Sequence, residues 1–225
     1  DLLYRDMADP ANLLRARQSA ALRGYWPYVD GDHIDPVAAA RYSELMADSQ
    51  HLIANHILDA IKLKPGQRLL DIGGGTGTFA RLASERFPEA STAVFDLPQV
   101  IAAISPRHRG AMEVVSGNMF EDPIPETFGT ISLVRILHDH DDAPVDRLLS
   151  RCFDALPNGG ELIIGEPMAG TRNAESIGHT YFGFYLWAMG SGRPRTYEEL
   201  KAALQRAGFH EIKEKRTHIP ALVRV

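Results

Sequence analysis

Leu69-Leu70-Asp71-Ile72-Gly73-Gly74-Gly75-Thr76-Gly77-Thr78-Phe79 is the stretch that decides the fold of this 225-residue chain. Residues 68–72 form a short apolar run typical of a strand, and the glycines let the backbone turn sharply and approach a ligand without Cβ clashes. Beyond the turn, apolar residues recur at helical spacing, at Phe79, Leu82, Ala83 and Phe87. This strand, glycine turn and helix together favour a nucleotide-like ligand at the helix N-terminus.

Two cofactors fit this turn. Gly75-Thr76-Gly77-Thr78-Phe79-Ala80 matches the relaxed dinucleotide pattern, so a nicotinamide or flavin stays open. Asp71 favours S-adenosylmethionine instead, because a carboxylate at the strand end suits an ammonium group better than a pyrophosphate. Asp96, in Phe95-Asp96-Leu97-Pro98, is placed to accept hydrogen bonds from ribose hydroxyls with either cofactor. The alternative is that this stretch binds no ligand, in which case Asp71 caps the turn and the glycines only allow a tight turn.

The composition indicates one large α/β domain with small-molecule partners. The net charge of -5 and the lack of a basic cluster argue against nucleic acid as the main partner. The single cysteine, Cys152, lies among apolar residues and is expected in the core. No transmembrane-length apolar run and no secretory signal is found, so we expect a cytoplasmic protein. Because residue 1 is Asp and not Met, we expect that an upstream portion is missing.

Strands and helices alternate after the glycine turn, which predicts a parallel sheet covered on both faces. Before the turn, we expect short helices and a loop over residues 1–35 and a long helix over residues 36–61. The expected later strands are 91–95, 112–115, 130–137 and 161–165, and the expected helices are 98–104, 143–156 and 196–207. Two closing segments, 211–217 and 221–225, are expected to add an antiparallel strand.

Ligands of open α/β sheets lie outside the carboxyl ends of the strands, so the residues after each strand form one set. This set comprises the Gly73–Gly77 turn, Asp96, Asn118-Met119, His138-Asp139-His140 and Glu166. We predict that Asn118, through its amide, and Met119, through its apolar side chain, bracket a ribose and an adenine. A strand-end turn is the alternative for Asn118.

His138 is the predicted general base, because an imidazole is suited near neutral pH to remove a proton from a hydroxyl. Glu166, at the end of the next strand, is the candidate that orients it. Asp139 is a third catalytic candidate, although it is adjacent in sequence and its side chain is expected to point away. A metal site is not expected, because consecutive residues at a strand end do not all face one ion. Asp141 or Asp142 is expected to cap the following helix, and the role of His140 stays open.

Thr180–Met189 is the most aromatic stretch and is apolar on all sides. Such an element is buried in the core, faces a partner or lines an apolar substrate pocket, and the whole stretch favours a hydrophobic acceptor. The pocket candidates are Tyr181, Phe184, Tyr185 and Met189.

Several motifs in order resemble class I S-adenosylmethionine-dependent O-methyltransferases of the caffeate-type small-molecule family. They are Leu70–Gly77, Phe95–Pro98, Gly117–Phe120, Leu137–Asp139 and Gly160–Glu166. Arg135–Asp142, Glu166–Thr171, Tyr181–Tyr185 and Met189–Arg195 are more narrowly similar to the bacterial carotenoid hydroxyneurosporene, or demethylspheroidene, O-methyltransferases. The resemblance covers about residues 66–210.

The resemblance implies a Rossmann-like, doubly wound, mostly parallel seven-stranded sheet with an antiparallel C-terminal strand, preceded by a helical linker. Residues 1–63 would be the linker that follows an absent dimerisation domain, and 64–225 the catalytic domain. It implies S-adenosylmethionine as cofactor, S-adenosylhomocysteine as product, and His138 as base. The implied cofactor site comprises Asp71, Gly73, Gly75, Asp96, Leu97, Asn118, Met119 and Arg135.

The sequence departs from the family pattern at three site positions. Asn118 stands where the family usually has aspartate, and His140 where it commonly has tryptophan. A second catalytic glutamate of the plant enzymes falls on Pro194, which leaves Glu166 to orient His138.

We therefore expect methyl transfer to a hydroxyl of an apolar small molecule, with a hydroxylated carotenoid favoured. A phenolic or polyketide hydroxyl is the alternative acceptor. An NAD(P)-dependent oxidoreductase and a non-catalytic S-adenosylmethionine-binding protein are alternatives of other classes. We expect a homodimer in the intact protein, no metal, no nucleic acid and no stable membrane insertion, with access to a lipophilic acceptor at the membrane surface.

Overall fold

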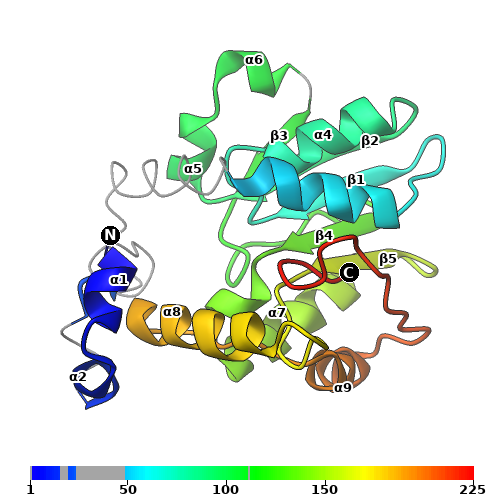
Figure 1. Cartoon of the computed structure of the whole chain (residues 1–225). Coiled ribbons are helices and arrows are strands. Elements are labelled where there is room, and N and C mark those ends of the chain that lie inside the picture. Colours follow the sequence, from blue (N-terminus) through cyan, green and yellow to red (C-terminus); the bar gives the residue numbers. More distant parts are fainter. Residues whose placement is uncertain (1, 16–19, 24–48, 111) are drawn as a thin grey trace.

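Five parallel strands form the central sheet of the computed structural model, which describes residues 2–15, 20–23, 49–110 and 112–225. The strands are β1 (Arg68–Ile72), β2 (Ser91–Asp96), β3 (Glu113–Ser116), β4 (Thr130–Val134) and β5 (Glu161–Gly165). Their order is β3-β2-β1-β4-β5, so the direction of winding reverses between β1 and β4 (Figure 1). In such sheets the reversal opens a crevice at the carboxyl ends of the two strands, where ligands bind.

Helices cover both faces of this sheet, as the alternating sequence predicts. The long helices are α4 (Thr78–Arg86), α7 (Asp142–Ala155), α8 (Phe182–Met189) and α9 (Tyr197–Ala207). The shorter ones are α1 (Leu2–Met7), α2 (Pro10–Arg15), α5 (Pro98–Ala103), α6 (Pro106–Arg109), the 3₁₀ turn η3 (Leu137–Asp139) and the π-helical turn η4 (Ser176–Tyr181). The expected helices at 143–156 and 196–207 are confirmed to within one residue by α7 and α9.

The side chains of β1 are buried on both faces of the sheet, in two different core clusters. Leu69 packs with α4 and with residues of the helical segment 49–60, whereas Leu70 and Ile72 pack with α7 and α9. Successive side chains of a strand point to opposite faces, so an apolar run at β1 fills two cores. The strand is therefore held rigidly up to its last residue, where the glycine turn begins.

The strand expected over 130–137 ends earlier, at Val134. Arg135 adopts a left-handed backbone with φ of 58°, which turns the chain out of the sheet. The apolar residues that follow enter η3 instead of extending β4. The loop from Arg135 to the start of α7 thus lies at the carboxyl edge of the sheet.

The predicted sheet of seven strands and its antiparallel C-terminal strand are not confirmed, since the described residues form a sheet of five. The closing segments make one antiparallel bridge, between Glu166 and Arg224, and paired backbone hydrogen bonds between Lys215 and Val225. Residues 213–216 are all charged and exposed, and a segment without alternating apolar residues has no buried face to fix it on the sheet.

The N-terminal helices α1 and α2 pack against α8, far from the glycine turn in sequence (Figure 1). The Trp187 indole N–H donates to the carbonyl of Leu13 at 3.1 Å. Residues 49–60 are helical, in agreement with the end of the helix expected over 36–61, whose earlier part lies outside the described residues. No helix in the described part of the chain combines the length and apolar character needed to cross a bilayer.

Candidate active site

Asp71, the fourth residue of β1, is fully buried beneath the glycine turn. Its Oδ1 accepts a hydrogen bond of 2.7 Å from the Ser132 hydroxyl of β4, whereas its Oδ2 has no partner among the described residues. Burial raises the pKa of Asp71 to about 7, against the lowering effect of the Ser132 hydrogen bond. A buried acceptor without a partner is uncommon in native proteins, and it suits a ligand that brings a donor.

Gly74 lets the turn pass directly over this carboxylate. A Cβ at Gly74 would lie 2.5 Å from Asp71 Oδ2, which is closer than real Cβ atoms come. Gly73, Gly75 and Gly77 have φ values of 69°, 58° and 79°, a conformation that glycine adopts without strain. The predicted turn is therefore formed, and its glycines are required by close approach and by backbone conformation.

Asp96 joins the end of β2 to the same turn. Its Oδ2 accepts from the Gly75 N–H at 2.8 Å, and its Oδ1 accepts from the Leu97 N–H at 2.7 Å. Burial raises the pKa of Asp96 to about 6, and the two backbone hydrogen bonds oppose the rise. The structure thus brings together five of the predicted cofactor residues, namely Asp71, Gly73, Gly75, Asp96 and Leu97.

Glu166, immediately after β5, organises the loop that carries His138. Its Oε1 accepts from the backbone N–H groups of Ile136 and Leu137, at 2.9 and 2.6 Å. Its Oε2 lies 2.5 Å from His138 Nδ1, across a sequence separation of 28 residues. One carboxylate therefore fixes both the backbone of the loop and the imidazole, which is the orienting role expected of Glu166.

His138 has a second carboxylate nearby. Asp139 Oδ1 lies 3.2 Å from His138 Nε2, although the expectation was that this side chain points away. That expectation assumed extended chain, whereas residues 137–139 form a 3₁₀ turn, in which neighbouring side chains are not on opposite faces. Burial opposes protonation of His138, but Asp139 and Glu166 outweigh it and raise its pKa. Burial likewise raises the pKa of Asp139 to about 6.

The glycine turn and the His138 loop meet at the switch between β1 and β4. A Cβ at Gly73 would collide with the Ile136 side chain, so the two segments are in contact. A buried carboxylate with an open oxygen and an imidazole held by a second carboxylate therefore occupy the ends of neighbouring strands.

Comparison with known proteins shows the family to which the chain belongs. A family model of the O-methyltransferase domain matches residues 17–210. The chain belongs to the O-methyltransferase domain family. It is 42% identical over its whole length to demethylspheroidene O-methyltransferase of Rhodobacter capsulatus, and 40% identical over 94% of its length to that of Cereibacter sphaeroides. It spans 57% and 58% of those two relatives.

Solved structures agree with the fold of this O-methyltransferase domain. Human N-acetylserotonin methyltransferase in complex with S-adenosylmethionine (SAM) superposes with a TM-score of 0.83, at 22% identity over 98% of this chain and 65% of that one. An O-methyltransferase from neocarzinostatin biosynthesis, in complex with SAM and a naphthoic acid, has a TM-score of 0.77 at 25% identity, covering 99% of this chain and 67% of that one. The resemblance drawn from the sequence motifs is confirmed at the level of the family.

In this O-methyltransferase domain, Asn118 and Met119 form a turn after β3. Asn118 Oδ1 accepts from the Phe120 N–H at 3.0 Å, and the Asn118 N–H donates to Asp122 Oδ2 at 2.7 Å. Met119 packs partly buried against the core. The side-chain carbonyl of Asn118 is therefore engaged in the turn that was the alternative to a ligand contact.

His140, whose role the sequence left open, packs edge-on against Phe120, with ring centroids 5.0 Å apart. The Arg147 guanidinium lies over the other ring of this pair, 5.3 Å from the Phe120 centroid. Burial, followed by the neighbouring His138, lowers the pKa of His140 to about 4. His140 is therefore a neutral aromatic side chain at physiological pH.

Arg135 contacts the helical segment 49–60 through its side chain. Its Nη1 donates to the Ser49 hydroxyl at 2.9 Å, at the edge of the helical segment 49–60. Its backbone N–H donates to the Gly165 carbonyl at 2.8 Å, and so continues the pairing of β4 with β5. Arg135 thus joins the start of the His138 loop to β5 and to segment 49–60, and its predicted place in the cofactor site stays a prediction.

The aromatic stretch divides between a surface beside His138 and a core. Tyr181 and Tyr185 stack with centroids 6.5 Å apart, while Phe184, Tyr185 and Met189 pack in the cluster between α8 and the N-terminal helices. Phe182, which was not among the predicted pocket residues, packs edge-on against His138 at 6.2 Å. The sequence did not single it out because the π-helical turn before it shifts the helical register.

A second residue that the sequence did not single out is Arg195, which is 5% exposed and bonds to the His138 loop. Within the described residues, no three His, Cys, Asp or Glu side chains are grouped in a way that would hold a metal ion.

Proposed function

We propose that the protein is a SAM-dependent O-methyltransferase that uses His138 as its general base. The observation that carries the proposal is the pairing of His138 with Glu166 at 2.5 Å, next to a glycine turn whose buried Asp71 has one carboxylate oxygen that no described residue bonds. Membership of the O-methyltransferase family and two complexes of similar structures with SAM support the same activity.

The residues of the turn fit SAM in charge and in space. Asp71 Oδ2 would accept from the ammonium group, and a bound cation would lower the pKa that burial raises to about 7. Asp96 would exchange its present Gly75 and Leu97 bonds in part for ribose hydroxyls. Met119, Phe120 and His140 offer apolar and aromatic surface for an adenine. When bound, the cofactor supplies a methyl group activated by a sulfonium.

His138 would take the proton of the acceptor hydroxyl at Nε2, while Glu166 holds the proton on Nδ1. Glu166 is almost fully buried and accepts two backbone N–H groups, so its charge is held in place by the loop it orients. Asp139, 3.2 Å from Nε2, would stabilise the imidazolium that forms. Phe182 packs against the ring and restricts the approach of water.

For the acceptor, we propose a hydroxylated carotenoid. Two relatives at 42% and 40% identity are demethylspheroidene O-methyltransferases, and Tyr181, Phe182 and Tyr185 supply aromatic surface close to His138. A phenolic acceptor is the alternative, supported by acetylserotonin O-methyltransferase of Bos taurus, which is 31% identical over 79% of the chain.

We also propose that residues 1–63 link residues 64–225, the catalytic domain, to a dimerisation domain of a cytoplasmic homodimer. The apolar packing of α1 and α2 on α8 supports a linker that is continuous with the acceptor side of the site. In that assembly, residues 211–217 and 221–225 would complete the sheet as antiparallel strands, starting from the Glu166–Arg224 bridge. A lipophilic acceptor would reach the site from a membrane surface.

The test is methyl transfer by the full-length protein. Methyl-labelled SAM is offered with a panel of carotenoid, phenolic and polyketide hydroxyls, and we expect label in the carotenoid ether. Label in a phenol alone would replace the acceptor but keep the activity. Binding of S-adenosylhomocysteine (SAH) without transfer to any acceptor would identify a non-catalytic protein, and binding of NAD or NADP in place of SAH would identify an oxidoreductase.

A further inference from the structure

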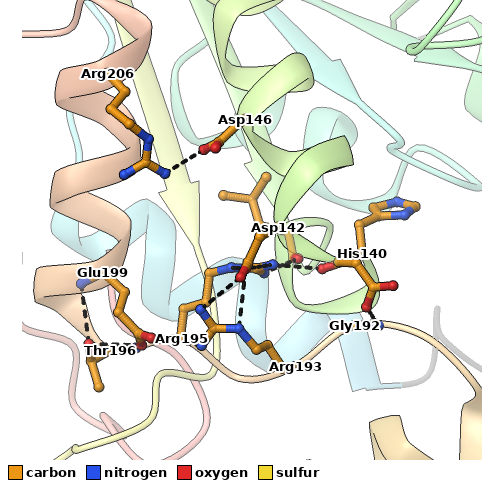
Figure 2. Close-up of polar contacts among 11 residues, drawn as sticks. His140, Asp142, Asp146, Gly192, Arg193, Arg195, Thr196, Glu199 and Arg206 are labelled. Atoms are coloured by element: carbon orange, nitrogen blue, oxygen red, sulfur yellow. Dashed lines mark hydrogen bonds and ion pairs between the residues drawn. The ribbon is translucent and has the colours of Figure 1, made fainter.

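Arg195 is a buried arginine whose guanidinium faces the backbone of the His138 loop. Nη1 donates to the Leu137 carbonyl at 2.6 Å, and Nη2 donates to the His140 carbonyl at 2.8 Å. Nε and Nη2 also donate to Asp142 Oδ1, at 3.0 and 2.8 Å, at the start of α7 (Figure 2). One guanidinium therefore joins the two ends of η3 to the helix that follows.

The residues just before Arg195 contact the carbonyls between those of Leu137 and His140. The Ser191 hydroxyl donates to the Asp139 carbonyl at 2.8 Å, and the Gly192 N–H donates to Asp141 Oδ1 at 3.0 Å. A Cβ at Gly192 would collide with the His138 carbonyl oxygen, and Gly192 has φ of 79°. Segment 191–195 thus contacts the carbonyl of each residue from Leu137 to His140.

This contact matters because a single 3₁₀ turn leaves most of its carbonyls without partners inside the turn. Glu166 accepts from the N–H groups at the front of the loop. Segment 191–195 donates hydrogen bonds to three carbonyls at its back, those of Leu137, Asp139 and His140. The loop is held from both sides, and His138 projects from its centre.

Arg195 itself is anchored to the rest of the fold. Its carbonyl accepts from the Ala169 N–H at 2.9 Å, and the next residue, Thr196, caps α9 in a reciprocal arrangement with Glu199. A buried cation is costly unless it is paired, and Asp142 provides the pair. Partial burial acts to raise the pKa of Asp142, but hydrogen bonds from Arg195 and Arg193 outweigh it and hold that pKa below its usual value.

We propose that Arg195 is a positioning residue of the reaction, which holds the Leu137–His140 backbone so that the His138 imidazole keeps its direction toward the acceptor hydroxyl. The proposal rests on the proposed function, in which His138 is the base. A lysine would keep the charge opposite Asp142, but its single ammonium group does not reproduce the planar fork that reaches two carbonyls and a carboxylate at once.

The test is Arg195→Lys in the full-length protein, with Arg206→Lys as the matched control. Arg206 belongs to α9 and pairs with Asp146 of α7 at 2.6 Å (Figure 2). Like Arg195, it bonds a carboxylate of α7, but this ion pair lies outside the His138 loop. For Arg195→Lys we expect kcat to fall about tenfold to hundredfold, as misplacement of a catalytic group does. The KM for SAM should stay within about twofold of the parent, and Arg206→Lys should match the parent in both constants.

Ring ¹⁵N resonances of His138 provide a readout that does not depend on turnover. Arg195→Lys should shift them and move the pH at which they titrate, and Gly192→Ala should do the same if the lysine variant does not fold. An unchanged kcat in Arg195→Lys, or a fall in melting temperature with unchanged ring resonances, would overturn the proposal. If instead His138→Gln retains kcat, the proposed base is wrong, and the resonances still decide whether Arg195 positions the loop.

Discussion

The two halves of the site are built in different ways. The glycine turn half is built on consecutive residues at the end of β1, with left-handed glycines that set the backbone, and Asp96 of β2 adds one hydrogen bond to it. The His138 half is assembled from three distant segments, since Glu166 lies 28 residues from His138 and Arg195 lies 58 residues from Leu137. The glycine turn therefore tolerates little change in side-chain size. The His138 loop depends instead on hydrogen bonds between segments that are distant in the sequence.

The largest expected effect is in the His138 half. His138→Gln removes the proposed general base, so kcat should fall by about 10²–10⁴-fold, the usual contribution of such a group. Calorimetric SAH affinity should remain that of the parent, because the glycine turn is intact. A variant that loses SAH binding to the same extent as turnover would show that the two halves are not separable.

The next effect is expected in the glycine turn half. Asp71→Asn exchanges a charged acceptor for a neutral one, so SAH affinity should fall about tenfold to hundredfold, in line with about 1.5–3 kcal/mol for a hydrogen bond to a charged group. Calorimetry measures this change. Asp59→Asn, on an exposed carboxylate paired with Arg86, is the control and should leave the affinity unchanged.

Asp71→Asn should also change how the free energy of unfolding depends on pH. Since burial raises the pKa of Asp71 from 3.8 to about 7, the folded protein binds more protons than the unfolded chain, and this group destabilises the fold as pH rises through that window. Without ligand, Asp71→Asn should therefore gain free energy of unfolding relative to the parent between pH 4 and pH 8. Denaturant titrations that show a constant difference over this range would contradict the assignment.

An alanine at Gly74 tests the close approach of the turn to Asp71 without changing the charge of the carboxylate. Gly74→Ala would place a Cβ against Asp71 Oδ2, so we expect a loss of about 1–3 kcal/mol of stability, as for other overpacked sites. Gly129→Ala is the matched control, because nothing lies within 4 Å of a Cβ there and its φ is not positive. Equal stability of the two variants by thermal or denaturant unfolding would mean that the turn relaxes freely.

The smallest expected effect is a shift in the pH profile. Burial opposes protonation of His138, but Asp139 and Glu166 raise its pKa, so kcat/KM should rise with pH around a midpoint above 6.5. Asp139→Asn removes one of these carboxylates and should move the midpoint to lower pH. A shift to higher pH would show that Asp139 does not act on His138 through its charge.

Much of this site follows from local sequence. The glycine turn, Asp96 at the end of β2 and Glu166 at the end of β5 were expected from the alternation of strands and helices, because parallel strands bring their carboxyl ends to one edge. Phe182 and Arg195 were not singled out. The first depends on a π-helical turn and the second on a loop that folds back over η3, and neither leaves a periodic signal in the sequence.

The succession of strands and helices along the chain and the presence of a glycine turn were determined by the sequence, since apolar runs and glycines act through the nearest backbone. The tertiary structure decided where β4 ends and how the loop after it is held. Arg135 turns left-handed, Glu166 binds the front of η3 and Arg195 binds its back, so the direction of His138 is set by contacts across the chain. Such contacts depend on packing of whole elements, which no short stretch of residues specifies.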